Sequence, residues 1–207
     1  MTMYVPSHFA VTDRRRQLEL IERYSFGTLT TVSAGRARIS TIPFLLGRDG
    51  ESLDGHIARA NTHWQDFTGA TDVLVGFIGP NAYISPTWYR SANMVPTWNY
   101  VAVEVRGRIE LLDDLAARLD LVDRLSAKYE ARLPKPWNSD KMDAALREKL
   151  LSAIVAFRVR IESIEAKAKL GQNRKPEERL AAAAVLESGA APSNEHQLAA
   201  LMRDAIG

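Results

Sequence analysis

Residues 101–110 read Val-Ala-Val-Glu-Val-Arg-Gly-Arg-Ile-Glu, and this stretch decides the fold class. Apolar side chains occupy its odd-numbered positions apart from Gly107, and charged side chains occupy its even-numbered positions from Glu104 onward. Successive side chains of a strand point to opposite faces, so one face of this segment is buried and the other meets water. The pattern predicts a half-buried antiparallel strand within Asn99–Leu112.

Further segments rich in β-forming residues lie on both sides of this strand, and turn signals separate them. Two of these signals are Ser33-Ala34-Gly35 and Arg48-Asp49-Gly50. The predicted strands are Phe26–Val32, Arg36–Leu46, Ser52–Ala58, Val73–Ile78, Ala82–Ser85, Asn99–Leu112 and a last one from Phe157 to Ile164.

Helical patterns interrupt and follow these strands. Thr12 and Asp13 are suited to cap a helix that runs to about Tyr24, and a helical turn is expected at His63–Phe67. The longer helices are predicted at Asp113–Arg132, with Leu115, Leu119, Val122 and Leu125 on its apolar face, at Asp140–Ser152, at 176–188 and at 193–205, the last two joined by Gly189–Ser193.

Short strands in close succession, with helices added, predict a mainly β fold: a small antiparallel barrel with peripheral helices. The regular alternation of strand and long helix that marks a doubly wound fold is missing. We expect residues 1–207 to form a single domain, with the barrel in 1–170, the inserted helices in 113–152 and a C-terminal helical extension in 171–207.

The overall composition restricts the function. The formal net charge is only +2, and no helix-turn-helix or zinc-finger pattern stands out, so a dedicated DNA-binding domain is not indicated. The chain has no cysteine, which excludes disulfides, thiolate nucleophiles, iron–sulfur clusters and cysteine-based zinc sites. No apolar run approaches the roughly 20 residues of a membrane span, and the N-terminus lacks the order of a signal peptide. We therefore expect a cytoplasmic protein with no membrane partner.

Aromatic residues gather between Tyr83 and Tyr100, where Trp88, Tyr89 and Trp98 also lie. They are interleaved with Pro, Ser, Asn and Thr. Aromatic side chains with polar tips in such a setting suit a surface that holds a flat ligand or a partner. The alternative is a loop-rich edge where Trp and Tyr cover a small core.

The segment Gly55–Asn61 ends a predicted strand and enters the expected helical turn. A helix start offers free N–H groups and positive potential, which favour an anionic phosphate group. Arg59 adds a bidentate cation, and His56 and Asn61 add further donors. The alternatives are a surface ion pair for Arg59 and a hydrogen-bonded strand histidine for His56.

Other kinds of chemistry find less support. His56 and His63 are seven positions apart with no carboxylate-rich cluster beside them, so we expect no metal site. Ser85 lacks the Gly-x-Ser-x-Gly setting of a serine nucleophile. We therefore assign no catalytic residue.

Six segments in order carry a resemblance to a known family. They are Tyr4–Phe9 (Tyr-Val-Pro-Ser-His-Phe), Thr41–Leu46 (Thr-Ile-Pro-Phe-Leu-Leu), Gly55–Trp64 (Gly-His-Ile-Ala-Arg-Ala-Asn-Thr-His-Trp), Gly79–Tyr89 (Gly-Pro-Asn-Ala-Tyr-Ile-Ser-Pro-Thr-Trp-Tyr), Val95–Tyr100 (Val-Pro-Thr-Trp-Asn-Tyr) and Lys169–Arg174 (Lys-Leu-Gly-Gln-Asn-Arg). Together the six resemble the FMN-binding negative transcriptional regulators of the PaiB type, over about residues 4 to 190.

The resemblance implies a split β-barrel of the pyridoxamine-phosphate-oxidase type that works as a homodimer with FMN at the subunit interface. It implies a non-catalytic, ligand-sensing regulator, with DNA as a possible partner; the alternative is a flavin-dependent oxidoreductase or flavin reductase on the same fold. The residues that it places at FMN are Arg38, Ile39, Ser40, Thr41, His56, Ile57, Ala58, Arg59, Asn61, Tyr83, Ser85, Trp98, Asn99, Gln172 and Arg174.

Two positions depart from the family pattern. The family usually has histidine where this chain has Thr41 and where it has Glu104. A carboxylate facing FMN would repel its phosphate. However, Glu104 shares parity with Arg106 and Arg108, and this alternation favours the solvent face.

Overall fold

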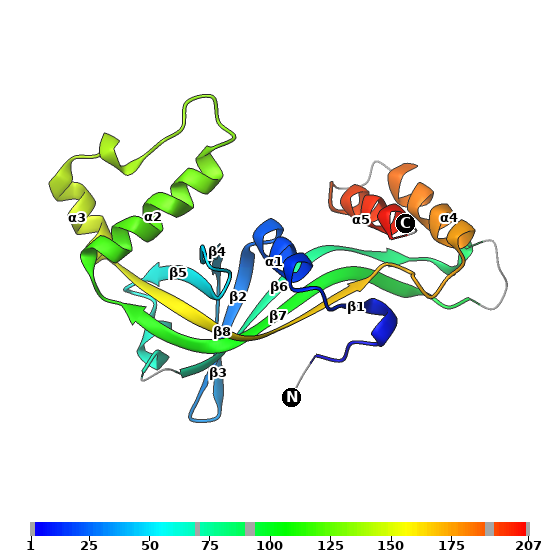
Figure 1. Cartoon of the computed structure of the whole chain (residues 1–207), viewed down its shortest axis with the longest axis horizontal. Coiled ribbons are helices and arrows are strands. Elements are labelled where there is room, and N and C mark those ends of the chain that lie inside the picture. Colours follow the sequence, from blue (N-terminus) through cyan, green and yellow to red (C-terminus); the bar gives the residue numbers. More distant parts are fainter. Residues whose placement is uncertain (1–2, 69–70, 90–93, 189–192, 206–207) are drawn as a thin grey trace. The chain divides into compact units, whose positions relative to one another are not determined.

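The computed structural model describes residues 3–68, 71–89, 94–188 and 193–205. Within them, eight strands form one sheet in the order β3-β2-β6-β7-β8-β5-β4, and β1 pairs with β8 (Figure 1). The strands are β1 (Ala10–Val11), β2 (Phe26–Ser33), β3 (Arg36–Pro43), β4 (Leu45–Leu46), β5 (Ser52–Ala58), β6 (Thr71–Ile84), β7 (Thr97–Leu112) and β8 (Ile154–Lys169).

The helices lie before, between and after the strands. They are α1 (Arg14–Arg23), α2 (Leu115–Glu130), α3 (Ala144–Ser152), α4 (Pro176–Ser188) and α5 (Ser193–Asp204), with short 3₁₀ turns η1 (Ser7–Phe9), η2 (Thr62–Asp66), η3 (Pro86–Trp88) and η4 (Ser139–Lys141). An antiparallel sheet with added helices confirms the predicted mainly β fold. None of the helices in the described part of the chain is long and apolar enough to cross a membrane.

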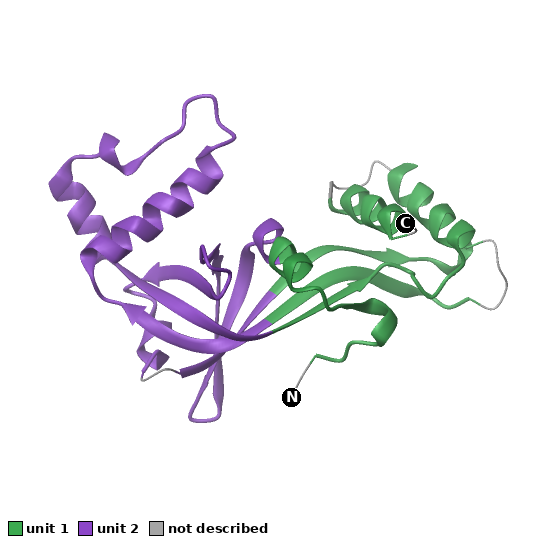
Figure 2. Ribbon diagram, in the orientation of Figure 1, with its two compact units in different colours: residues 1–20, 77–104, 164–207 green, residues 21–76, 105–163 purple. Residues whose placement is uncertain are grey.

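The chain divides into two compact units (Figure 2). Unit 1 consists of residues 1–20, 77–104 and 164–207, and unit 2 of residues 21–76 and 105–163. The long strands β6, β7 and β8 contribute residues to both.

The core of unit 2 is built around Phe157. Its ring makes edge-on contacts with Phe44 and Phe67, with ring centroids 6.2 and 5.3 Å apart. Gly55 belongs to this core because a Cβ there would lie 2.8 Å from the Phe157 ring. Val105, from the stretch that opened the sequence analysis, is fully buried as its parity predicted.

The β2–β3 hairpin confirms the turn predicted at Ser33–Gly35. The strands pair without a break from Phe26 with Pro43 to Ser33 with Arg36. Ala34 and Gly35 make the turn with positive φ angles of 49° and 74°. Two successive positive φ angles match the twist of the flanking strands, and glycine adopts them without strain.

Helices α2 and α3 begin at aspartate caps, and their starts differ from the predicted ones. The Asp114 side chain accepts a hydrogen bond from Ala116 N, and Asp143 accepts from Ala145 N and Leu146 N. The apolar face predicted for α2 is wrong in part. Leu125 is buried as predicted, and it forms a cluster with Leu121, Leu45 and Ala156. Leu115, by contrast, is 40% exposed.

In unit 1, α4 and α5 pack against each other through small and apolar side chains. Ala182, Ala183, Leu198 and Met202 are all fully buried. The loop predicted at Gly189–Ser193 falls largely on 189–192, outside the described residues.

The strands predicted at Val73–Ile78 and Ala82–Ser85 are one continuous strand, β6. Its pairing with β2 ends at Gly76. Pro80 lies in the part of β6 beyond this pairing, where the strand has an open edge. The Asn194 side chain covers this edge: its Nδ2 donates to Asn81 O (2.7 Å), and its Oδ1 accepts from Asn81 N (3.3 Å).

Candidate functional site

The first cluster of polar side chains lies in unit 2 around His63, which is 3% exposed. Its Nε2 lies 2.9 Å from Thr31 Oγ1 on β2, and its Nδ1 lies 2.7 Å from Ser40 Oγ on β3. Both ring nitrogens are therefore hydrogen-bonded. Burial lowers the pKa of His63, and the nearby Asp66 carboxylate only partly opposes this shift.

The network continues through the η2 turn. Thr31 Oγ1 donates to Asp66 Oδ2 (2.9 Å), and Asn61 Nδ2 donates to Ser40 Oγ (3.1 Å). Asn61 Oδ1 accepts from His63 N (3.1 Å), so the Asn61 side chain caps the start of η2, where the helical turn was predicted. A fully bonded network of this kind fixes β2, β3 and η2 against one another.

Two exposed arginines flank this network. Arg38 Nη1 donates to Thr62 O (2.9 Å), and its Nε lies 3.5 Å from Asp66 Oδ2. Arg59 donates from Nε to Ser152 O (2.9 Å) and from Nη2 to Ile154 O (3.1 Å). The third nitrogen of each guanidinium has no partner within the described ranges. The structure thus holds two cations in place with donors left for an anionic group.

The other predicted residues of unit 2 face different ways. Ser40 and Ile57 are buried, so the Ser40 hydroxyl serves the network and Ile57 serves the core. Ile39 and Thr41 point to the other side of β3 and are exposed, and Ala58 is exposed at the end of β5. His56 is half-buried and lines a pocket beneath α2 and α3.

The remaining predicted residues lie in unit 1, where aromatic rings form the second cluster. Tyr83 makes edge-on contacts with Trp88 and Trp98, at 6.4 and 6.3 Å between ring centroids. Tyr83 is 46% exposed and Trp98 is 54% exposed, so the rings do not cover a core. Ser85 Oγ accepts from Thr87 N (3.2 Å) and caps η3.

Cations stand beside these rings. Lys169 Nζ donates to Trp98 O (2.8 Å) and to Thr97 Oγ1, and the Arg174 guanidinium lies 5.7 Å from the Tyr89 ring centroid. Burial, then the charges of Lys167 and Arg174, lower the pKa of Lys169. The positive potential that disfavours this ammonium favours an anion.

Gln172 and Asn99 serve the local structure of unit 1. Gln172 Oε1 accepts from Leu170 N (2.8 Å), and its Nε2 donates to Ala168 O (2.6 Å), which shapes the turn after β8. Asn99 is buried, and its Nδ2 lies 3.5 Å from Met202 Sδ.

Sequence reasoning missed the residues that organise the first cluster. His63, Thr31 and Asp66 were not among the predicted site residues, although His63 lies in the quoted Gly55–Trp64 segment. Spacing alone cannot show that Thr31 and Ser40 converge on one imidazole, because this depends on the β2–β3 register and on η2.

Sequence reasoning also missed an ion cluster that links β5, β8 and α2. The Asp54 carboxylate is fully buried and accepts from Arg158 Nε (2.7 Å), Arg158 Nη2 (2.9 Å) and Arg124 Nη2 (2.8 Å). Burial would raise the pKa of Asp54, but these bonds outweigh it and lower the pKa. Arg124 also donates to Asp120 (2.7 Å).

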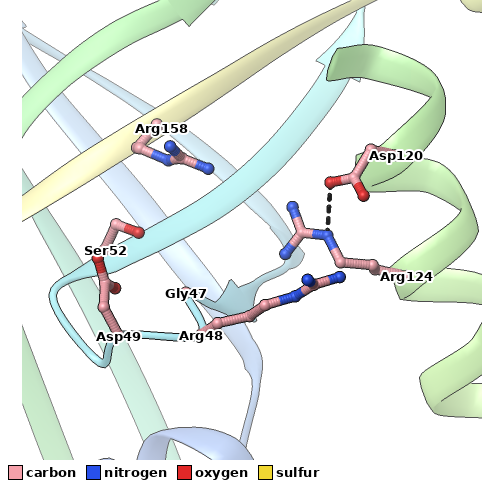
Figure 3. A pocket seen from close by; sticks show the side chains of 7 residues that line it. All are labelled: Gly47, Arg48, Asp49, Ser52, Asp120, Arg124 and Arg158. Carbon is pink, nitrogen blue, oxygen red and sulfur yellow. Dashed lines mark hydrogen bonds and ion pairs between the residues drawn. The ribbon is translucent and has the colours of Figure 1, made fainter. Parts of the chain in front are cut away.

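A hollow of about 330 Å³ lies beside this cluster, and Figure 3 shows Arg48, Arg124 and Arg158 around it. Both Asp54 oxygens and two nitrogens of Arg124 and of Arg158 are engaged within the protein. We interpret the cluster as structural: it ties α2 to β5 and β8.

Comparison with solved structures defines the class of fold. The flavocytochrome Anf3 from Azotobacter vinelandii matches with a TM-score of 0.60 at 15% identity, over 81% of this chain and 73% of that one. The FAD and heme binding protein from Mycobacterium smegmatis matches with a TM-score of 0.59 at 17% identity, over 84% and 79%. The chain has the split β-barrel fold.

Sequence comparison defines the family within this class. The family described as "Putative FMN-binding domain" matches residues 3–163. The Bacillus subtilis protein named protease synthase and sporulation protein PAI 2 is 36% identical over 208 residues, 99% of this chain and 98% of that protein. An uncharacterized Saccharomyces cerevisiae protein is 28% identical over 66% of this chain and 95% of its own length. The chain belongs to this PaiB-like FMN-binding family, whose cofactor is FMN.

Proposed function

We propose that this chain is a homodimeric FMN-binding regulator that senses a ligand at its flavin site and does not turn over substrate. The similarity to the Bacillus subtilis relative carries this proposal, because it spans nearly the whole of both chains. The name of that relative links it to protease synthesis and sporulation. DNA is proposed as a partner on the family resemblance alone, since the sequence contains no recognisable DNA-reading motif.

Arg38 and Arg59 are best placed to bind the FMN phosphate. Each guanidinium is fixed by contacts to unit 2 and keeps a nitrogen available, as a phosphate site requires. Asn61 sets the position of the η2 start between them through its bonds to Ser40 and His63. His56, Ile57 and Ala58 then contribute through the main chain of β5.

The flavin ring, which supplies electron-accepting chemistry when bound, needs a flat and partly apolar surface. The exposed side chains of Ile39 and Thr41 on β3 offer one wall. Tyr83 and Trp98 offer exposed rings, and Arg174 and Lys169 offer positive charge. We propose that these unit 1 residues, with Ser85, Asn99 and Gln172 supporting them, contact the flavin in the homodimer.

The outer face of β2 and β3 suits a second copy of the chain. Phe26, Val32 and Ile39 are each 64–65% exposed. The register pairs Ile39 with Thr30, which puts all three side chains on one face. Such exposed apolar groups mark an interaction surface. Light scattering at micromolar concentration should give twice the chain mass, and Ile39→Asp should shift it toward the monomer.

The phosphate assignment is tested by an FMN fluorescence titration of Arg59→Ala. Loss of a charge-assisted contact of about 2–4 kcal/mol should weaken FMN binding roughly 30- to 1000-fold. Arg48→Ala, which removes an exposed guanidinium of the same unit, is the matched control and should bind FMN normally. Arg38→Ala provides a second test if Arg59→Ala is unfolded by circular dichroism. Unchanged affinity in both variants would overturn the assignment.

The rate of NADH or NADPH oxidation distinguishes the oxidoreductase alternative from the regulatory function. The FMN-loaded protein should oxidise NADH or NADPH no faster than the same concentration of free FMN. A saturable rate well above that of free FMN would establish flavin-dependent catalysis instead of a regulatory role.

A further inference from the structure

The hollow of about 330 Å³ beside the Asp54 cluster is lined by polar side chains and one glycine, all within unit 2. They come from the turn between β4 and β5, from β5 itself, from β8 and from α2. Figure 3 shows Ser52, Arg124 and Arg158 on different sides of it. An apolar ligand would take water from these groups without replacing its hydrogen bonds, so the wall suits a hydrophilic ligand.

Two arginines of this wall are held in fixed positions from below. The fully buried Asp54 carboxylate accepts hydrogen bonds from both Arg124 and Arg158. These bonds and the bond to Asp120 occupy Nε and Nη2 of each guanidinium and leave Nη1 without a partner in the described residues. The two side chains are 20% and 32% exposed. A buried carboxylate thus orients two guanidiniums that keep donors for a ligand.

Ser52 adds a hydroxyl that the fold does not use. The residue is 5% exposed and lines the hollow, and its Oγ has no hydrogen-bond partner in the described ranges. A Cβ at Gly47 would lie 2.2 Å from this Oγ, so glycine leaves the hydroxyl its place. Because the hydroxyl belongs to the wall of the hollow, a ligand there can bond to it.

Arg48 is exposed and makes no bond to the described part of the protein. Its side chain points toward Arg124 in Figure 3, although both carry positive charge. Like charges that face one hollow repel each other, and an anion bound between them relieves the repulsion. A phosphate group accepts several such charge-assisted hydrogen bonds at once.

Two exposed aspartates of the wall restrict the rest of the ligand. Asp49 Oδ1 accepts from Glu51 N (2.9 Å), and Asp120 Oδ2 accepts from Arg124 Nε (2.7 Å). The second oxygen of each carboxylate has no partner in the described residues and can accept a hydrogen bond from a hydroxyl group. With Asp54 they balance the three arginines, so the hollow favours a ligand that carries hydroxyl groups beside its negative charge.

The volume of the hollow agrees with such a ligand. It equals the space of roughly ten water molecules at about 30 Å³ each. A phosphate group alone would leave most of this space filled with water. A phosphate joined to one sugar ring fits.

We propose that this hollow is a binding site for a sugar phosphate. Its phosphate bonds to the three arginines and to the Ser52 hydroxyl, and its sugar hydroxyls bond to the two exposed aspartates. The hollow shares no residue with the proposed FMN site, and its test does not depend on FMN.

Glucose 6-phosphate, inorganic phosphate and glucose are the probes, and calorimetry measures their binding to the purified full chain. We expect a dissociation constant of about 0.1–1 mM for glucose 6-phosphate, from the usual binding free energy per atom of a small ligand. Inorganic phosphate should bind about 3- to 10-fold more weakly, because it lacks the hydroxyl groups that bond to the aspartates. Glucose, which lacks the phosphate, should show no saturable binding up to about 10 mM.

Arg48→Ala removes a guanidinium that the fold does not use and should weaken glucose 6-phosphate at least tenfold. Arg132→Ala removes an exposed guanidinium of the same unit outside the hollow and should bind like the parent. Ser52→Ala should weaken binding about 3- to 10-fold and decides the matter if thermal unfolding shows that Arg48→Ala is not folded.

Asp120→Asn tests the sugar half of the site. It removes an acceptor for hydroxyl groups and a negative charge near the phosphate, so the preference for glucose 6-phosphate over inorganic phosphate should fall. Equal binding of the two phosphates by the parent protein would overturn the sugar assignment and identify free phosphate as the ligand. Absence of saturable glucose 6-phosphate binding up to about 10 mM, or unchanged affinity in folded Arg48→Ala, would overturn the site itself.

Discussion

Two histidines of unit 2, seven positions apart in the sequence, differ in the hydrogen bonding of their rings. His63 is buried with both ring nitrogens bonded to hydroxyl groups. His56 lies beneath α2 and α3. Its Nδ1 is inaccessible to solvent and has no hydrogen-bond partner in the described residues. The difference lies in the neighbours: polar side chains of β2 and β3 reach His63, whereas apolar side chains of α2 and α3 surround His56. A satisfied imidazole holds a structure together, whereas the buried Nδ1 of His56 without a partner costs folding free energy.

A third polar group on the same strand gives the largest expected effect. Asp54 lies two positions before His56 and shares its parity, yet both its oxygens are bonded. Asp54→Asn should lower the free energy of unfolding by about 3 kcal/mol, because it leaves two guanidiniums without their carboxylate. Asp120→Asn, which alters an exposed partner of Arg124, should cost less than about 1 kcal/mol. Equal costs in urea unfolding would show that the buried cluster is not what ties α2 to the barrel.

Replacing each histidine by phenylalanine tests the comparison itself. His63→Phe leaves the Thr31 and Ser40 hydroxyls in the core without their partner and should cost about 2–3 kcal/mol. His56→Phe fills apolar space and removes an unsatisfied nitrogen, so it should change stability by less than about 1 kcal/mol. Urea unfolding of the two variants measures both. A cost for His56→Phe as large as that for His63→Phe would mean that His56 has a partner in solution.

A smaller effect concerns pH. Burial lowers the pKa of both histidines, so the unfolded chain binds more protons than the folded one below the ordinary histidine pKa of about 6.5. Stability should therefore fall by about 1–2 kcal/mol between pH 7.5 and pH 5.5. His56→Phe should remove part of this loss. If its unfolding free energy has the same pH slope as the parent, His56 does not contribute to the pH dependence.

Local patterns in the sequence predicted much of the barrel. The segment Ser52–Ala58 is β5 as predicted, and the parity of Val105 is confirmed by its burial. Both follow from alternation, a property of neighbouring residues. The break predicted between Ile78 and Ala82 is wrong, because β6 continues through Pro80 to Ile84.

The candidate site was less predictable because it depends on register and on packing between distant segments. Asp54 lies opposite Arg158, a pairing of β5 with β8 across about a hundred residues. Neither alternative for Arg59 describes its contacts fully, since its guanidinium bonds to main-chain carbonyls of Ser152 and Ile154. Similarly, His56 is a strand histidine but not a satisfied one.

The smallest expected effect concerns Glu104, where the family usually has histidine. Val103 and Val105 on either side are fully buried, so Glu104 lies on the opposite, outward parity of β7, where it is half-buried. A carboxylate that faced FMN would repel its phosphate, and Glu104→His would then tighten binding strongly. From the parity we expect a change of less than about tenfold in FMN affinity, equivalent to about 1.4 kcal/mol. Fluorescence titration of Glu104→His beside Glu110→His, a change on the same parity of the same strand, measures this. A gain well beyond tenfold for Glu104→His alone would show that β7 turns this side chain into the flavin site, and that the substitution of histidine by glutamate has weakened the pocket.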